Sequence, residues 1–188
     1  MAIELKGSWT KGFAYDVHIQ ESTFLGYDEY SYPKFQNSRS TMGELVYQLK
    51  YKNKVENVKL IVALLVNSFK GFDYFDYIVP APFSSQRVNQ PVDLIAAELS
   101  ERINVPVAKV LYKITGSQPL KNIHDKAQKL SHLCHDIQIQ NRELIKGRNI
   151  LLIDDLYESG STLEASTNIL LINGASSVSV LAMTKTKG

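Results

Sequence analysis

Residues 150–162 read ILLIDDLYESGST, and this stretch decides the fold. Its apolar start predicts a buried strand over 149–153, followed at the C-terminal end by Asp154 and Asp155. The turn after the two carboxylates opens directly into a helix predicted over 162–172. Ligands of open α/β sheets bind in the crevice where strands end and helices begin. The stretch therefore predicts a parallel sheet and a binding site at one of its edges.

The turn has the chemistry of a phosphate site. Its backbone N–H groups and the helix N-terminus favour an anion, and Gly160 lets the backbone approach a ligand closely. Hydroxyl groups come from Ser159, Ser161 and Thr162. The two carboxylates would repel a phosphate, but they accept hydrogen bonds from a ribose diol. A sugar with free hydroxyls and a 5′-phosphate matches the whole stretch. The structural alternative is a solvated strand end followed by a capped helix.

Outside this stretch, helical and strand patterns alternate along the chain. Further strands are expected over 74–80, 105–111 and 177–183, and helices over 55–69, 89–103 and 126–133. Another helix begins at Thr41, with Glu44 as its capping-box partner, and is broken at Asn53. Residues 1–40 predict short strands or a hairpin, with a loop over 27–39, and residues 115–125 predict a loop.

Alternation of this kind predicts an α/β fold with a mostly parallel sheet flanked by helices. The 188 residues suit one domain, divided into a β-rich N-terminal segment, 1–40, and a core, 41–188. A net charge of +2 gives no basic surface of the kind that nucleic acid requires, so nucleic-acid binding is not expected. The longest apolar run, 60–66, is too short for a membrane span, and a single cysteine, Cys134, fits a reducing cytoplasm.

The stretch 150–162 resembles the motif with which type I phosphoribosyltransferases bind phosphoribosyl diphosphate (PRPP). The resemblance implies that fold, with residues 1–40 as a small hood over the site. It implies that Asp154 and Asp155 hold the ribose 2′- and 3′-hydroxyls. The 5′-phosphate would be bound by Tyr157, Glu158, Ser159, Gly160, Ser161 and Thr162. Two residues depart from the usual pattern: Glu158 is acidic where many members carry Thr or Ala, and Tyr157 is bulkier than usual.

The pyrophosphate of PRPP needs a second anion site, which the family places after the first strand of the sheet. The matching segment is 79–87, VPAPFSSQR, in which Ser84, Ser85 and Arg87 are suitable donors. The structural alternative is a polar turn that caps the next helix. The later stretch 115–129 stands where the family has its catalytic loop, with Gln118, Lys121 and Lys126 as the expected working residues.

Within that family the chain resembles the ComF-like branch over about 42–184. It keeps VP-x-P at 79–82, NQ at 89–90 and the LKY of LVYQLKYKNK at 49–51. The four-cysteine zinc module and the arginine-rich stretch of that branch are absent from the sequence. In the LKY motif, Lys50 is a candidate phosphate ligand, and the alternative is that Lys50 only favours the helix C-terminus.

The resemblance implies an enzyme that transfers phosphoribosyl from PRPP to a nitrogen acceptor, a nucleobase or an amine, and releases pyrophosphate. Mg²⁺ would arrive bound to PRPP, with no dedicated metal ligands in the protein. A PRPP- or nucleotide-sensing regulator, or a ComF-like competence accessory protein, is the alternative. The oligomeric state is open between a monomer and a homodimer. Aromatic side chains that could stack on a base, or form the core of the hood, are Tyr15, Tyr27, Tyr30, Tyr32 and Phe35.

Overall fold

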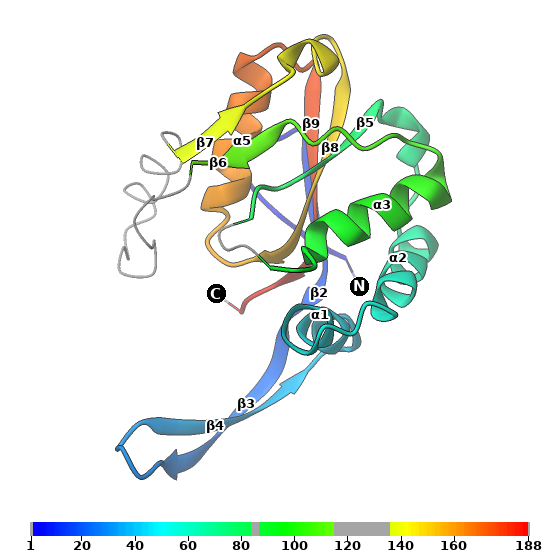
Figure 1. Cartoon of the computed structure of the whole chain (residues 1–188). Coiled ribbons are helices and arrows are strands. Elements are labelled where there is room, and N and C mark those ends of the chain that lie inside the picture. The colour runs from blue at the N-terminus through cyan, green and yellow to red at the C-terminus, as the bar shows by residue number, and fades with distance from the viewer. Residues whose placement is uncertain (1, 84–86, 115–135, 188) are drawn as a thin grey trace.

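A computed structural model describes residues 2–83, 87–114 and 136–187. Its centre is a five-stranded sheet in the order β1-β2-β9-β8-β5 (Figure 1). The strands are β1 (Ile3–Glu4), β2 (Lys11–Val17), β5 (Tyr77–Pro80), β8 (Asn149–Tyr157) and β9 (Ser177–Lys185). β1 is antiparallel to β2, and the other neighbouring pairs are parallel. The predicted mostly parallel α/β sheet is confirmed.

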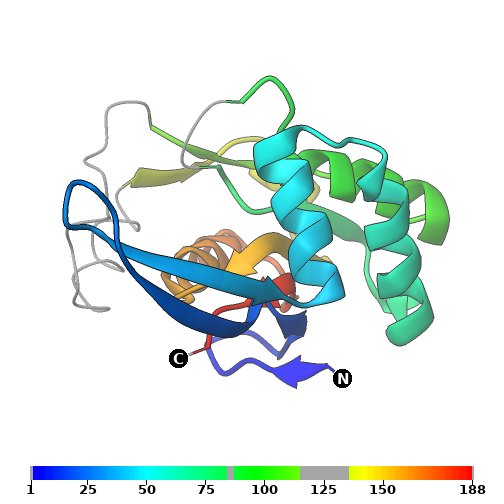
Figure 2. The same cartoon turned by 90° about the horizontal axis from the view of Figure 1, so that it is seen from below.

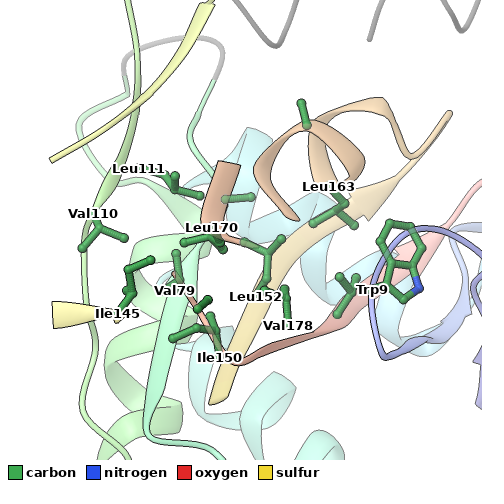
Figure 3. Close-up of a cluster of buried hydrophobic side chains, with 14 of the residues drawn as sticks. Trp9, Val79, Val110, Leu111, Ile145, Ile150, Leu152, Leu163, Leu170 and Val178 are labelled. Atoms are coloured by element: carbon green, nitrogen blue, oxygen red, sulfur yellow. The ribbon is translucent and has the colours of Figure 1, made fainter. Parts of the chain in front are cut away.

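Helices cover both faces of the sheet (Figure 1). On one face lie α1 (Thr41–Lys52), α2 (Asn57–Ser68) and α3 (Pro91–Ile103), and on the other lies α5 (Ser161–Ile172). Residues of β8 alternate between the two cores: Ile150 and Leu152 pack with α5, whereas Leu151 and Ile153 pack with α1, α2 and α3. A strand buried on both faces carries apolar residues at every position. Figure 3 shows the core on the α5 side.

Smaller elements complete the described chain: η1 (Phe72–Tyr74), β6 (Leu111–Lys113), β7 (Ile137–Ile139) and η3 (Arg142–Leu144). β6 and β7 form an antiparallel pair. The strand predicted over 105–111 was wrong in extent, because only Val107 bridges β5 before β6 begins. The Pro106 carbonyl accepts from Ile78 N–H, but Pro106 has no N–H with which to continue a ladder. The short helix predicted over 126–133 lies outside the described residues.

Residues 1–40 divide into two structures. β1 and β2 belong to the central sheet, whereas β3 (Ile19–Tyr27) and β4 (Pro33–Arg39) form a separate two-stranded ribbon. The ribbon projects from the end of the molecule at which the parallel strands terminate (Figures 1 and 2). The loop predicted over 27–39 was wrong, because most of it is β4. The turn between the strands is held by Asp28, whose side chain accepts from the N–H groups of Tyr30 and Tyr32.

The aromatic side chains of the ribbon lie at the surface. Phe24 and Phe35 are opposite one another across the strands, with ring centroids 5.6 Å apart, and Tyr27 packs edge-on against Phe24. Tyr27, Tyr30 and Tyr32 are each more than two-thirds exposed. These aromatics therefore form no hood core. Tyr15 differs from them, because it lies on β2 and packs edge-on against Phe69 at the C-terminal end of α2.

Two element boundaries near the predicted site were wrong. β8 does not stop at Ile153 but continues to Tyr157, so Asp154 and Asp155 belong to the strand. β9 is equally long, and the ladder between the two reaches Tyr157 and Lys185. The turn is correspondingly short, 158–160, and α5 begins at Ser161. The carboxylates are thus held on rigid, paired backbone.

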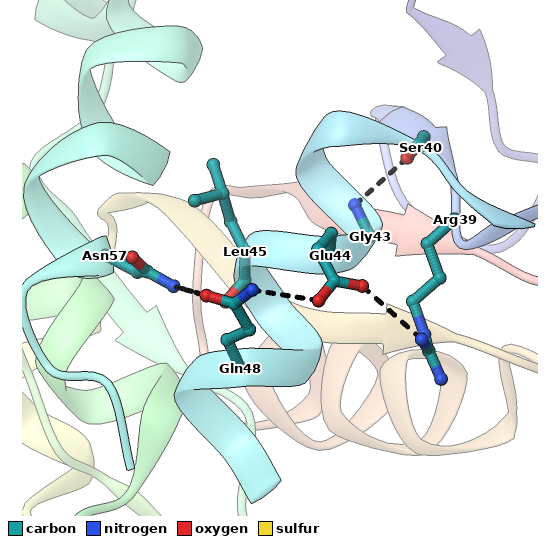
Figure 4. A network of polar contacts seen from close by, with 7 residues as sticks. All are labelled: Arg39, Ser40, Gly43, Glu44, Leu45, Gln48 and Asn57. Atoms are coloured by element: carbon teal, nitrogen blue, oxygen red, sulfur yellow. Dashed lines mark hydrogen bonds and ion pairs between the residues drawn. The ribbon is translucent and has the colours of Figure 1, made fainter. Parts of the chain in front are cut away.

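The N-terminus of α1 is capped one residue earlier than the sequence predicts. Ser40 Oγ accepts from Gly43 N–H at 3.0 Å and donates to the Val17 carbonyl at 2.6 Å. Glu44 makes no capping box, and its carboxylate instead pairs with Arg39 and accepts from Gln48 (Figure 4). Ser40 caps the helix in place of Thr41 because its hydroxyl can bond to the helix and to the neighbouring strand at the same time.

Ser40→Ala is expected to lower the free energy of unfolding by about 1–2 kcal/mol, because it removes a helix cap and takes the hydrogen-bond donor from the partly buried Val17 carbonyl. Thr41→Ala is the matched control, since Thr41 is exposed and makes no capping bond. Urea unfolding of both variants measures the difference. Equal stability of the two variants would contradict the assignment of Ser40 as the cap.

Candidate functional site

The carboxyl ends of the parallel strands meet at one edge of the sheet, the edge facing the viewer in Figure 2. This edge carries Asp154 and Asp155 on β8, Thr184 on β9, and His18 directly after β2. α1 and the first turn of α5 border it. The sequence predicted the β8 residues at such an edge, and the structure adds groups from the two neighbouring strands.

Asp155 is paired with a lysine from α1. Its Oδ2 lies 2.7 Å from Lys50 Nζ, and the exposed fractions of the two side chains are 10% and 23%. The pairing follows from strand geometry, because side chains alternate between the two faces and Asp155 falls on the face that packs against α1. Lys50 was proposed as a phosphate ligand, and in this structure it is the counter-ion of Asp155.

Asp154 lies on the opposite face of β8, and its surroundings destabilise its carboxylate form. Burial, then the negative charge of Asp155, raises the pKa of Asp154 to about 7 from its ordinary 3.8. Opposing contributions come from the Asp155 N–H, which donates to Asp154 Oδ1 at 2.8 Å, and from Lys50 and Lys113. Asp154 is therefore a mixture of acid and carboxylate near neutral pH. A bound cation or a set of hydroxyl donors would favour the carboxylate.

Asp154→Asn is expected to stabilise the ligand-free protein at pH 8. The folded protein holds a proton on Asp154 between pH 4 and 7 that the unfolded chain has lost, so stability falls as pH rises through that window and remains reduced above it. Asparagine carries no charge, and so removes this penalty. Thermal unfolding of both proteins at pH 8 and pH 4 provides the measurement. A melting-temperature gain that is as large at pH 4 as at pH 8 would contradict the expectation.

The turn after β8 is organised around Gly160. This residue has φ +77° and is the N-cap of α5. A β-carbon added to it would lie 2.6 Å from the Tyr157 ring, so only glycine leaves the ring in place. Ser161 N–H donates to Ser159 Oγ at 3.4 Å, and the two hydroxyls are 3.0 Å apart. The turn thus folds on itself directly before the first turn of α5, where a helix N-terminus favours an anion.

The predicted phosphate residues differ in their surroundings. Glu158 is exposed, so its charge is solvated, and its carbonyl lies 3.5 Å from Thr186 Oγ1. Ser161 is buried, and Thr162 is partly buried in the first turn of α5. Tyr157 ends β8, and its carbonyl accepts from Thr186 N–H at 2.9 Å. Burial, with the nearby Glu164 carboxylate, raises the pKa of the Tyr157 hydroxyl, so it stays protonated at neutral pH.

The N-terminal loop between β1 and β2 packs against this turn and against the first turn of α5. Trp9 is buried, donates from Nε1 to the Leu5 carbonyl at 2.9 Å, and meets the Tyr157 ring edge-on at 6.5 Å. Ser8 N–H lies 3.2 Å from both carboxylate oxygens of Glu164, in the first turn of α5. The sequence prediction missed these contacts, because residues so distant along the chain carry no local signal of one another.

The proposed pyrophosphate segment is described only in part. Arg87 donates to the Lys50 carbonyl at 3.2 Å, and its guanidinium stands 5.5 Å from the Tyr51 ring centroid. The structure therefore brings Arg87 to the end of α1 that carries Lys50. Ser84 and Ser85 lie outside the described residues, as do Gln118, Lys121 and Lys126 of the predicted catalytic loop.

Three basic residues around this end of the sheet were missed by sequence reasoning. Lys113 ends β6 and acts electrostatically on Asp154, and burial lowers the pKa of Lys113. His18 follows β2 and contacts Thr184. Arg39 stacks on the Tyr47 ring at 3.7 Å and pairs with Glu44 at 3.4 Å, which Figure 4 shows as part of a chain running to Asn57. A basic or histidine residue directly at a strand end was the signal available in the sequence for Lys113 and His18.

Within residues 2–83, 87–114 and 136–187, no group of three or more His, Cys, Asp or Glu side chains is placed to hold a metal ion. Asp155 is already engaged by Lys50. A divalent cation would therefore fit this edge only with most of its ligands supplied by a bound phosphate or water. In the same residues, no helix has the length and apolarity needed to span a bilayer.

Comparison with known proteins shows the fold. No family model and no curated protein sequence matches the chain. Among solved structures, it is similar to glutamine PRPP amidotransferase from B. subtilis complexed with ADP and GMP, at 15% identity and a TM-score of 0.53. That match covers 79% of this chain and 34% of the amidotransferase, so the chain spans about a third of its length.

A second match is adenine phosphoribosyl transferase from Trypanosoma brucei, in complex with AMP, pyrophosphate and ribose-5-phosphate. It has 17% identity and a TM-score of 0.45, over 86% of this chain and 62% of that one. The chain has the type I phosphoribosyltransferase fold, as the sequence predicted.

Proposed function

We propose that this chain, with its type I phosphoribosyltransferase fold, transfers phosphoribosyl from PRPP to a nitrogen acceptor. The observation that carries the proposal is the end of β8, where two adjacent carboxylates, Asp154 and Asp155, are followed five residues later by the glycine that caps the N-terminus of α5. The carboxylates are acceptors for a ribose diol, and the helix N-terminus suits a 5′-phosphate. The spacing fits a single ligand that carries both groups.

The described residues divide the work of binding. Asp155, held by Lys50, and Asp154 accept hydrogen bonds from the ribose 2′- and 3′-hydroxyls, and their negative charge stabilises the oxocarbenium-like transition state. The turn 158–160 and the first turn of α5 bind the 5′-phosphate. Arg87, with Lys121 from outside the described residues, neutralises the departing pyrophosphate. Positioning of this kind accelerates a displacement without a covalent intermediate.

Mg²⁺ bound with PRPP would neutralise the pyrophosphate oxygens, and the nearby carboxylates Asp154 and Asp155 offer it favourable charge. The positive charge of Mg²⁺ would in turn lower the raised pKa of Asp154 and so favour its carboxylate form. The proposed compartment is the cytoplasm, in keeping with the single Cys134.

The test combines binding and turnover. The protein is incubated with PRPP, Mg²⁺ and one acceptor at a time from adenine, guanine, hypoxanthine, uracil, orotate and ammonium, and pyrophosphate release is measured. Calorimetry gives the affinity for PRPP. We expect Asp155→Asn to weaken PRPP binding by roughly 10- to 100-fold, through loss of a charged hydrogen-bond acceptor. Asp73→Asn is the control, because Asp73 is an exposed carboxylate outside the site.

Each outcome decides a different part of the proposal. Pyrophosphate release with one of the acceptors, lost in Asp155→Asn and kept in Asp73→Asn, supports the enzyme. PRPP binding without release for any acceptor would favour a PRPP-sensing regulator built on the same site. Absence of PRPP binding would overturn both readings.

A further inference from the structure

His18 occupies a position that the roles above leave unused. It directly follows β2, the strand that lies next to β9 in the sheet. Its backbone N–H donates to the Lys185 carbonyl at 2.7 Å. Its ring Nδ1 is 3.0 Å from Thr184 Oγ1, and the side chain is partly buried. Because β2, β8 and β9 are parallel, the ring stands at the same sheet edge as Asp154 and Asp155.

The hydrogen bonds around Thr184 fix the tautomer of this ring. Thr184 Oγ1 donates its only hydrogen to the Asp155 carbonyl, at 3.2 Å, and a carbonyl can only accept. The contact between Thr184 Oγ1 and His18 Nδ1 must therefore use a hydrogen from Nδ1. A neutral imidazole with hydrogen on Nδ1 has its lone pair on Nε2. In the described part of the chain, Nε2 has no hydrogen-bond partner, so this lone pair is available.

The charges around His18 keep the ring neutral. Burial is the largest cause that lowers its pKa below the ordinary 6.5, and Arg39 on β4 adds to it. Lys50 on α1 acts in the same direction, whereas Asp155 on β8 and Glu44 on α1 act against it. The side chain is thus an unprotonated base at neutral pH, and it is oriented through Thr184 by the backbone of the residue that would hold the ribose.

We propose that His18 is the base that takes the proton from the nitrogen acceptor, an inference that rests on the proposed phosphoribosyl transfer. In that step the acceptor nitrogen forms a bond to C1′ of the ribose. The bond from C1′ to the pyrophosphate oxygen breaks, and its electron pair leaves with pyrophosphate. The proton lost by the nitrogen passes to Nε2 of His18. The acceptor class is therefore a neutral N–H compound, such as a nucleobase, whose nitrogen becomes acidic as the bond forms.

Two variants separate the role of the His18 imidazole from that of Thr184, which orients it. His18→Asn keeps a donor near the position of Nδ1 but has no Nε2, so kcat should fall by about 10²- to 10⁴-fold. The affinity for PRPP should stay within about twofold, since neither carboxylate is touched. Thr184→Val keeps the imidazole and removes the hydroxyl that selects its tautomer, so a smaller fall in kcat is expected. The pH profile of wild-type kcat should decline on the acid side as His18 is protonated, and His18→Asn should lack this part of the decline and keep only the part caused by protonation of Asp154.

The ring itself can be observed in the wild-type protein. Two-bond ¹H–¹⁵N spectra distinguish the tautomers of the four histidines, and loss of one set of signals in His18→Asn assigns His18. We expect hydrogen on Nδ1 and a pKa below 6.5. Hydrogen on Nε2 would overturn the inference, as would wild-type kcat and pH profile in His18→Asn. Wild-type protein that binds PRPP but releases no pyrophosphate with any acceptor overturns the proposed function as well, so the two failures are distinguishable.

Discussion

Gly160→Ala is expected to weaken PRPP binding by at least about tenfold and to lower stability. The backbone there has φ +77°, which costs a residue with a β-carbon about 1–2 kcal/mol. The new methyl would also meet the Tyr157 ring 2.6 Å away, and Trp9 packs edge-on against the same ring. The ring must therefore rotate away, which forfeits an aromatic contact worth about 0.5–1.5 kcal/mol. The turn of the candidate phosphate site should shift with it.

Gly71→Ala is the matched control for the backbone strain. Gly71 has φ +80°, but no atom lies within 4 Å of the position of its added β-carbon. Both variants should lose similar stability from strain, and only Gly160→Ala should lose PRPP affinity, measured by calorimetry. Trp9 is the only tryptophan, so its fluorescence reports displacement of the Tyr157 ring. Unchanged fluorescence and affinity in Gly160→Ala would show that the turn tolerates the methyl.

Lys50→Met is expected to have the second large effect. It leaves the buried carboxylate of Asp155 without its partner at 2.7 Å, and breaking such a pair costs about 3–5 kcal/mol in a fully buried setting. The cost here should fall near the lower limit, because the lysine retains some exposure. Loss of the cation also removes a charge that lowers the pKa of Asp154. PRPP binding at pH 7 should therefore weaken and recover in part at pH 8.5.

Lys52→Met is the control, since Lys52 lies in the same last turn of α1 and makes no ion pair with a described residue. Chemical unfolding and PRPP titration at the two pH values measure both variants. If Lys50→Met matched Lys52→Met in stability and affinity, the ion pair would have no energetic role. If Lys50→Met bound PRPP more tightly than wild type, Lys50 would instead compete with the ribose for Asp155.

The parts of the fold that the sequence predicted are those with strong local periodicity. The short apolar run before Asp154 is typical of a strand buried on both faces, and the helix that follows is preceded by Gly160 and opens with hydroxyl residues. β4 was missed because it is exposed along nearly its whole length and so carries no apolar alternation. At the start of α1, both Ser40 and Thr41 are competent caps, and the nearby Val17 carbonyl favours Ser40.

The part of the candidate site that is contiguous in the sequence was predicted. The part that is assembled from residues far apart in the sequence was missed. Asp154 to Thr162 are consecutive, so their chemistry is legible in the sequence. The pairing of Lys50 with Asp155 depends on which face of β8 meets α1, and the contact of His18 with Thr184 depends on β2 lying beside β9. Neither relation is encoded by residue spacing, because each is a consequence of the way strands are ordered in the sheet.

The parallel pairing of β2 with β9 has a consequence for how the protein is made. Lys11 pairs in register with Ser179, so β2 has only the two-residue strand β1 as a partner until β9 has been synthesised. Loop closure over so long a separation is slow, and the edge of β2 that β9 will cover is open to aggregation until β9 pairs with it. Because His18 follows β2, and Thr184 and Lys185 come from β9, the acceptor side of the site is completed last during biosynthesis. A nascent chain arrested before β9 would hold the carboxylates of β8 without the histidine arrangement beside them.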